Sequence, residues 1–131
     1  MESIDLKVHE KYITDIINKH IAADLVFCES KAEMNDKIAM SLWNGNNAPN
    51  KIMLLSHISN EEIENHIAAL GLRGVVKEKP ELLEYVELIT TPQDFLKHLV
   101  LHEVAHIKNN WSQKKETECD LWAFKVTKHG N

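Results

Sequence analysis

The sequence has few cysteines and no long apolar run, and each absence excludes a class of protein. Two cysteines among 131 residues are too few for a disulfide framework or for a zinc site made only of cysteines. No apolar run approaches the roughly 20 residues of a membrane span. The N-terminal stretch contains acidic residues and lacks the apolar core of a signal peptide. We therefore expect a cytoplasmic protein that does not bind membranes.

Positive charge, internal repeats and low-complexity segments are also scarce. The net charge is −5 with histidine neutral, which argues against a nucleic-acid-binding surface. Apolar residues make up 44% of the chain and charged residues 27%, the composition of a globular protein. No linker divides the sequence, and its length suits one compact domain. We expect residues 1–131 to form a single domain.

Hydrophobic periodicity predicts both helices and strands. Helical spacing of apolar residues is found in the segments 4–20, 59–70, 80–89, 92–108 and 116–126. Short or alternating apolar runs indicate strands at 25–28, 37–43 and 51–58. The fold predicted is α+β, with a small, mainly antiparallel sheet packed on helices.

The connections are predicted from turn residues. Gly71 is expected to end the second helix, with a connection at 72–79. The turn-forming residues 44–50 join the last two strands, which we expect to form an antiparallel hairpin. A strand at 84–89 is the alternative to the third helix.

The most informative stretch is residues 102–106, which follow the pattern H-E-x-x-H. Residues four apart on a helix share one face, so His102 and His106 are placed to offer two imidazole nitrogens to one metal ion. Glu103, on the adjacent side, is placed to reach a water bound to that metal. The pattern is short, and a helix whose histidines and glutamate face solvent is the alternative.

Clear boundary signals surround this helix. Thr91 is expected to be its N-cap, with Pro92 at the first helical position and Asp94 three residues after the cap. Asn109 and Asn110 are expected to end it. Its apolar face would bury the two histidines, which is costly without polar partners. A metal ion would provide such a partner.

Acidic residues begin the next expected helix. Glu116 and Asp120 are four apart and share one face. A catalytic zinc site has three protein ligands and an open position for water. Glu116 is the candidate third ligand, and Asp120 is a candidate acceptor for the remaining N–H of a ligand histidine. Glu118 is the rival ligand, although it points about 160–200° away from Glu116 on a regular helix. Taken alone, the acidic residues are better explained as favourable charge at a helix N-terminus.

H-E-x-x-H followed by E-x-x-x-D resembles the gluzincin metallopeptidases, and most closely the small intracellular ImmA/IrrE-type domains among them. The resemblance rests mainly on residues 91–127. It implies a zincin-like fold in which His102, His106 and Glu116 bind Zn²⁺ and Glu103 is the general base. It also implies hydrolysis of a protein or peptide, and domains of this type often cleave transcriptional regulators.

Further roles are assigned to residues outside the motif. The strand expected at 51–58 is the candidate edge for an extended substrate, because a peptide can add to a free sheet edge by main-chain hydrogen bonds. An internal strand without a substrate role is the alternative. Tyr85, His57 and His98 are candidate donors to an oxyanion. His98 is not expected to be a ligand together with His106, because eight residues of helix span about 12 Å.

We therefore expect a zinc-dependent metallopeptidase whose partner is a protein or peptide substrate, such as a regulatory protein. A non-catalytic metal-binding or protein-interaction module is the second hypothesis. The presence of Glu103 argues against it, because a structural zinc site needs no base. A metal-free helical scaffold is the third. Cys119 lies next to the expected site, where a buried helix thiol is its expected role.

Overall fold

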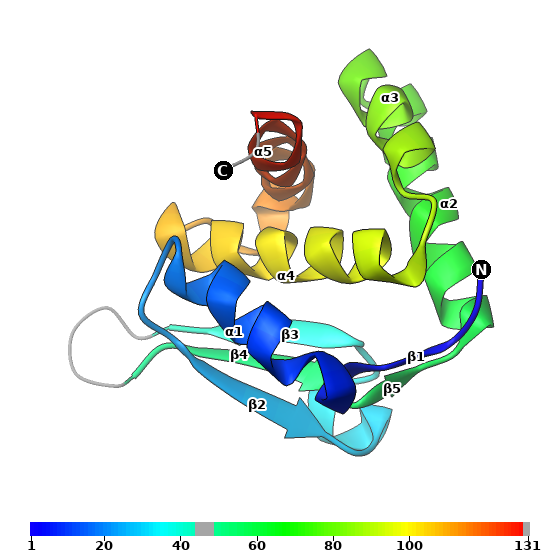
Figure 1. The fold of residues 1–131 in the computed structure, drawn as a ribbon. Coiled ribbons are helices and arrows are strands. Elements are labelled where there is room, and N and C mark those ends of the chain that lie inside the picture. Colours follow the sequence, from blue (N-terminus) through cyan, green and yellow to red (C-terminus); the bar gives the residue numbers. More distant parts are fainter. Residues whose placement is uncertain (44–48, 130–131) are drawn as a thin grey trace.

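Helix α4 (Pro92–Lys108) lies across the middle of the computed structural model, which describes residues 1–43 and 49–129. Figure 1 shows a three-stranded sheet on one side of α4, and α5 (Glu116–His129) together with the pair α2 (Asn60–Val76) and α3 (Pro80–Leu88) rising on the other. The α+β class predicted from the sequence is confirmed. Residues 44–48 of the predicted turn lie outside the described residues.

Two small sheets form the strand layer. In the larger one, β4 (Lys51–Leu55) lies between β2 (Asp24–Cys28) and β3 (Ala39–Leu42). β3 and β4 are antiparallel, which confirms the predicted hairpin, but β2 and β4 are parallel. The three-stranded sheet is therefore mixed, and the prediction of a mainly antiparallel sheet holds only for the other pairings. The smaller sheet pairs β1 (Ile4–Asp5) with β5 (His57–Ile58) antiparallel.

The predicted substrate edge at 51–58 is wrong. β4 forms hydrogen-bonded ladders with a neighbour on each side, so its backbone groups are not free to bind a peptide. The predicted strand is also interrupted at Ser56, whose backbone N–H donates to the carbonyl of Cys28 at 2.8 Å. The edge strand beside α4 is β3, which packs against that helix.

The N-terminal helix is shorter than the expected 4–20. Residues before α1 (Glu10–Asn18) form β1 and the short 3₁₀ helix η1 (Leu6–His9). The backbone N–H of Leu6 donates to the carbonyl of Ser56 at 2.8 Å. This contact ties the first residues to the strand layer, and periodicity within one segment does not reveal such pairing. A second 3₁₀ helix, η2 (Lys31–Met34), connects β2 to β3.

The predicted helix end at Gly71 is also wrong, since α2 continues to Val76 and only residues 77–79 of the expected connection join it to α3. A Cβ on Gly74 would lie 3.0 Å from the Leu82 Cβ and 3.2 Å from the Lys79 carbonyl. Glycine at this position therefore allows α3 to pack closely on α2. The prediction of a helix over 80–89 is confirmed by α3, and the alternative strand is not formed.

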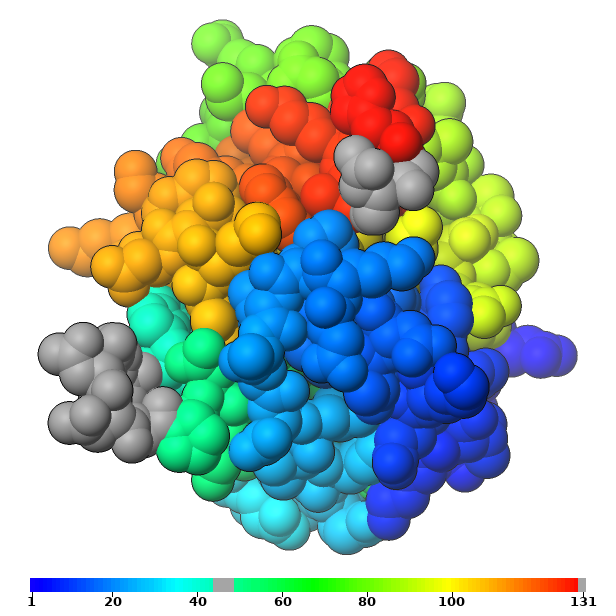
Figure 2. All heavy atoms as spheres, turned by 60° about the vertical axis from the view of Figure 1, so that its left-hand side comes forward, coloured from blue at the N-terminus to red at the C-terminus, as the bar shows by residue number. Residues whose placement is uncertain are grey.

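The helix that contains the H-E-x-x-H pattern has the predicted boundaries. The Thr91 side chain accepts a hydrogen bond from the Asp94 backbone N–H, and the Asp94 carboxylate accepts from the Thr91 N–H, both at 3.1 Å. Leu96 and Val100 are fully buried, and α1 packs against this helix. In Figure 2 the N-terminal part of the chain, in blue, occupies the centre of the visible face. The region that the structure describes contains no helix both long and apolar enough to cross a membrane.

Candidate metal centre

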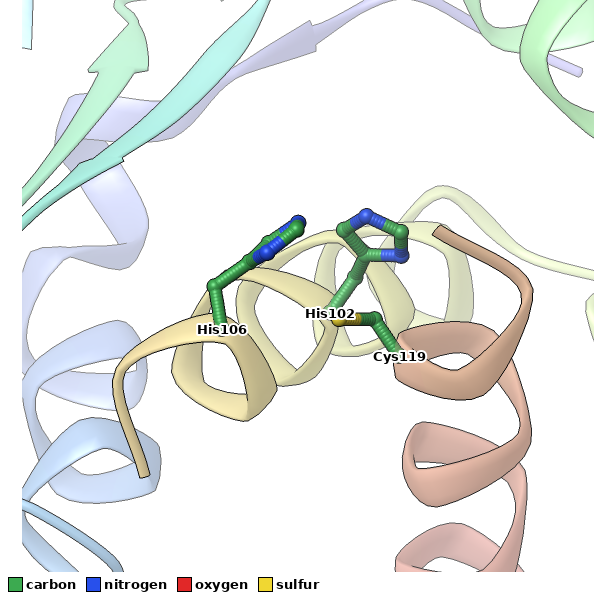
Figure 3. Close-up of side chains that lie close together, drawn as sticks. All are labelled: His102, His106 and Cys119. Atoms are coloured by element: carbon green, nitrogen blue, oxygen red, sulfur yellow. The ribbon is translucent and has the colours of Figure 1, made fainter. Parts of the chain in front are cut away.

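Helix α4 places His102 and His106 on one face, one turn apart. Their side chains are buried, and their ring centroids lie 5.1 Å apart. Figure 3 shows the two imidazoles on the same side of α4 and Cys119 reaching toward them from α5. One ligand atom from each of these three residues lies within 4.8 Å of the others. The three side chains are therefore close enough to bind one metal ion.

A tight turn brings the chain back to this face. Asn110 adopts a left-handed conformation with φ of 54°, and the Trp111 N–H donates to the His106 carbonyl at 2.9 Å. These are features of a helix C-terminus closed by a Schellman motif, with asparagine in place of the usual glycine. The turn and the 3₁₀ helix η3 (Gln113–Lys115) lead directly into α5, so the short separation between His106 and Glu116 is sufficient.

Glu116 lies between the two imidazoles. Its Oε2 is 3.0 Å from Nε2 of His102, and its Oε1 is 2.9 Å from Nε2 of His106. The second contact is an ion pair without hydrogen-bond geometry, so Oε1 is buried with no hydrogen bond among the described residues. Two zinc ligands at about 2.1 Å in tetrahedral geometry would be about 3.4 Å apart. The direct N–O contacts are therefore shorter than the separation of two zinc ligands, and the side chains would have to move apart around a bound cation.

The other imidazole nitrogens are already occupied. Nδ1 of His102 donates to Oδ1 of Asp120 at 2.6 Å, and Nδ1 of His106 donates to the Trp111 carbonyl at 2.7 Å. The Arg73 guanidinium pairs with the other Asp120 oxygen. These contacts fix both rings with Nε2 facing Glu116, which is how protein groups orient metal-binding histidines.

The charges of the site follow from these contacts. Burial alone lowers the pKa of His102, but hydrogen bonds to two carboxylates outweigh burial and raise that pKa well above its usual value. Burial likewise opposes protonation of His106, yet contacts with Cys119 and Glu116 raise its pKa to about 10. Burial raises the pKa of Glu116, but the two imidazoles outweigh it and hold this pKa well below the usual range. A bound cation would replace protons on the two histidines.

A cavity of about 330 Å³ opens beside these residues, and Glu103 lines it together with His102, His106 and Glu116. Glu103 is 6% exposed. The Ser41 hydroxyl, on β3, lies 2.6 Å from Oε1 of Glu103 and 2.9 Å from its backbone carbonyl. Hydrogen bonds from Ser41 thus connect the edge strand β3 to Glu103.

The three candidate oxyanion donors lie in different surroundings. His98 lines the cavity, where its Nε2 is 3.4 Å from Asp120 and its Nδ1 is 3.0 Å from the Tyr85 hydroxyl. Burial lowers the pKa of His98 to about 4, so this ring is neutral. Tyr85 is 1% exposed and His57 is on the outer surface, and neither lines the cavity. Only His98 is positioned to contact a bound molecule.

Sequence reasoning missed Ser41 and Arg73 and gave Cys119 no part in metal binding. Cys119 is the buried helix thiol that was expected next to the site, and its position three residues after Glu116 places both on one helical face. That spacing was the available signal. No local signal marks Ser41 and Arg73, because they belong to β3 and α2 and reach the site through the fold. Glu118, the rival ligand, lines a different hollow from the cavity beside the two histidines.

Comparison of the chain with protein-family models, curated proteins and solved structures gives no match.

Proposed function

We propose that this protein is a zinc-dependent peptidase of the zincin type. The observation that supports this most strongly is the convergence of three groups: Nε2 of His102, Nε2 of His106 and the Glu116 carboxylate, with N–O distances of 2.9–3.0 Å. Two histidines and one glutamate are a known ligand set of catalytic zinc. The buried Oε1 of Glu116, which has no hydrogen bond among the described residues, supports Glu116 as the third ligand.

Glu103 is the proposed general base. Zinc, when bound, polarises a water molecule and stabilises negative charge on the substrate. Glu103 would take the proton from the attacking water and deliver it to the leaving nitrogen as the peptide bond breaks. Ser41 would hold Oε1 of this carboxylate through the 2.6 Å hydrogen bond.

β3 is the proposed substrate-binding strand, in place of the predicted edge at 51–58. It is the edge strand beside α4, and Ala39 lies on it and lines the same cavity as Glu103. An extended peptide could form main-chain hydrogen bonds along this edge. The proposed substrate is therefore a segment of a protein or peptide in extended conformation.

A non-catalytic metal site is the second candidate, and the position of Cys119 favours it. If the thiolate of Cys119 joined the two histidines and Glu116, four protein ligands would fill the tetrahedral positions. Structural zinc sites are closed in this way, whereas catalytic sites keep a position for water. The number of ligands therefore separates the two functions.

Metal content is the first test. Protein purified without added metal should contain about one zinc per chain, and His106→Ala should lose it. Glu116→Ala should also lose zinc, while the matched variant Glu118→Ala should retain it. Loss of zinc in Glu118→Ala with retention in Glu116→Ala would transfer the ligand role to Glu118. Absence of zinc, with no uptake after its addition, would refute the metal site.

Cobalt substitution and hydrolysis then distinguish the two functions. Cobalt(II) in place of zinc gives a thiolate charge-transfer band only if Cys119 is a ligand, and Cys119→Ala provides the control. For a peptidase we expect no such band, cleavage of unstructured polypeptides, and a loss of about 10²- to 10⁴-fold in Glu103→Gln. Equal cleavage by Glu103→Gln would reject the mechanism. A strong thiolate band with no cleavage would favour the structural site.

A further inference from the structure

Lysine side chains gather next to the candidate metal centre, in a hollow of about 300 Å³ between the end of α2 and the start of α5. Three basic residues come from α2 and the loop after it, and a fourth comes from η3. The full lining is Arg73, Lys77, Lys79, Lys114, Glu116, Thr117 and Glu118. The hollow thus contains four basic side chains, although the net charge of the chain is −5.

The charge of this hollow is only partly neutralised. Arg73 is paired with Asp120, and Glu116 is paired with the two imidazoles. None of the three lysines forms an ion pair within residues 1–43 and 49–129. Glu118 is the remaining acidic residue of the lining. Three ammonium groups therefore face one carboxylate, which leaves an excess of positive charge.

The backbone holds two of these lysines in defined positions. The Lys77 N–H donates to the Arg73 carbonyl at 2.9 Å, and the Lys79 N–H donates to the Gly74 carbonyl at 2.8 Å. Glu78 between them adopts a left-handed conformation with φ of 55°. Basic residues at the end of α2 also interact favourably with the helix dipole. That effect does not explain Lys114, which reaches the same hollow from a different segment.

The hollow and the metal centre share walls. Arg73 and Glu116 line both this hollow and the cavity that contains the two histidines. Because the two spaces share these walls, the residues close to the cleaved bond of a peptide at the metal centre would be the ones nearest to the lysines.

We infer that this hollow binds a carboxylate of the substrate, and that the protein therefore prefers peptides with an acidic group close to the cleaved bond. The inference rests on the proposed function, since it names the substrate class of that same site. Ammonium groups attract a carboxylate by charge and hydrogen bonding. The carboxylate could belong to an acidic side chain or to a peptide C-terminus, and the experiment below separates these sources.

Binding is measured apart from cleavage, in the Glu103→Gln protein. The peptides are titrated into this protein either loaded with zinc or treated with EDTA, and NMR follows the amide chemical shifts. The probes are three pools of N-acetylated peptides that are otherwise uncharged. The first has a central glutamate and an amidated C-terminus. The second has glutamine and an amidated C-terminus, and the third has glutamine and a free C-terminal carboxylate. We expect the first or the third pool to shift the amides of Lys77, Lys79 and Lys114 and to bind about three- to tenfold more tightly than the second.

Charge-matched variants test where the preference arises. Lys77→Gln/Lys79→Gln should remove it, whereas Lys19→Gln/Lys125→Gln, which removes the same charge from exposed positions elsewhere, should keep it. Equal binding of all pools, or equal loss in both double variants, would overturn the inference. Cleavage of neutral and acidic pools at the same rate would overturn it and leave the peptidase intact. Preferential binding without cleavage by the wild type would support the hollow and reject the peptidase.

Discussion

Replacing Asp120 with asparagine tests whether this carboxylate controls the affinity of the metal centre. Asp120 is 1% exposed, and its two oxygens contact Nδ1 of His102 and the guanidinium of Arg73. Asparagine has nearly the same shape, but it has no charge and its NH₂ group donates where the carboxylate accepts. The variant therefore loses one of these contacts and weakens the other.

The lost contacts should weaken metal binding and also destabilise the metal-free protein. Removing the partner of a ligand histidine weakens metal binding by about 10- to 100-fold. Loss of one hydrogen bond to a charged group lowers the free energy of unfolding of the metal-free protein by about 1.5–3 kcal/mol. The lower part of that range is expected, because the Arg73 side chain is 30% exposed. At free zinc about 100 times the wild-type Kd, zinc stabilises the wild type by about 2.7 kcal/mol and Asp120→Asn by only about 0.4–1.4 kcal/mol.

Competition with a chromophoric chelator measures the zinc Kd, and urea unfolding with and without zinc measures the stabilisation. Glu118→Gln is the matched control, since it removes one negative charge from the same helix at a partly exposed position. It should bind zinc like the wild type. If Asp120→Asn bound zinc within about twofold of the wild type, well inside the expected loss, the view that Asp120 orients His102 would be refuted.

Three other predictions concern the supporting contacts. Ser41→Ala should lower the free energy of unfolding by about 1–3 kcal/mol, because buried Glu103 loses its donor; urea unfolding should show a smaller loss in a Glu103→Met background, where the hydroxyl keeps only its contact with the backbone carbonyl of residue 103. Glu78→Gly should stabilise the protein by about 1 kcal/mol in thermal unfolding, because glycine removes the strain of the left-handed φ of 55°, whereas Glu78→Ala should not stabilise it. Asp94→Asn should destabilise the metal-free protein by about 1 kcal/mol at neutral pH through the Thr91 capping box. Burial opposes ionisation of Asp94, but hydrogen bonds from the threonines lower its pKa below 3.8. This stabilisation is therefore complete above about pH 3.8 and is lost as the pH falls through the folded-state pKa, so urea unfolding should show the two proteins converging at acidic pH.

Local signals were sufficient to predict α4 and the spacing of its histidines. The Thr91 cap and Pro92 lie next to the residues they affect, so the beginning of the helix can be predicted from a few positions. The spacing of His102 and His106 depends only on helical periodicity. For the same reason, the sequence is sufficient to place Glu116 and Asp120 on one face of α5.

The errors arose where a residue responds to a distant segment. Gly74 is in the last turn of α2, where a Cβ would lie 3.0 Å from Leu82 and 3.2 Å from the Lys79 carbonyl. A glycine in a sequence marks a helix end or a close contact, and only the partner segment distinguishes the two. β4 was predicted to be an edge strand for an extended substrate, but its second neighbour, the parallel strand β2, comes from residues 24–28, earlier in the chain. Strand order depends on pairing between segments, which periodicity does not determine.

The polar contacts that orient the site also depend on segments far apart in the sequence. A buried carboxylate needs a partner, so burial of Glu103 and Asp120 implies that donors exist without identifying them. The donor to Glu103 is Ser41 on β3, which precedes it by 62 residues. The donor to Asp120 is Arg73 on α2, which precedes it by 47 residues. The spacing of the proposed ligands therefore depends on α4 and α5 alone. The orientation of Glu103 and His102 depends on the packing of α4 against β3 and of α5 against α2. A change that disturbs this packing should alter metal affinity even when every proposed ligand is retained.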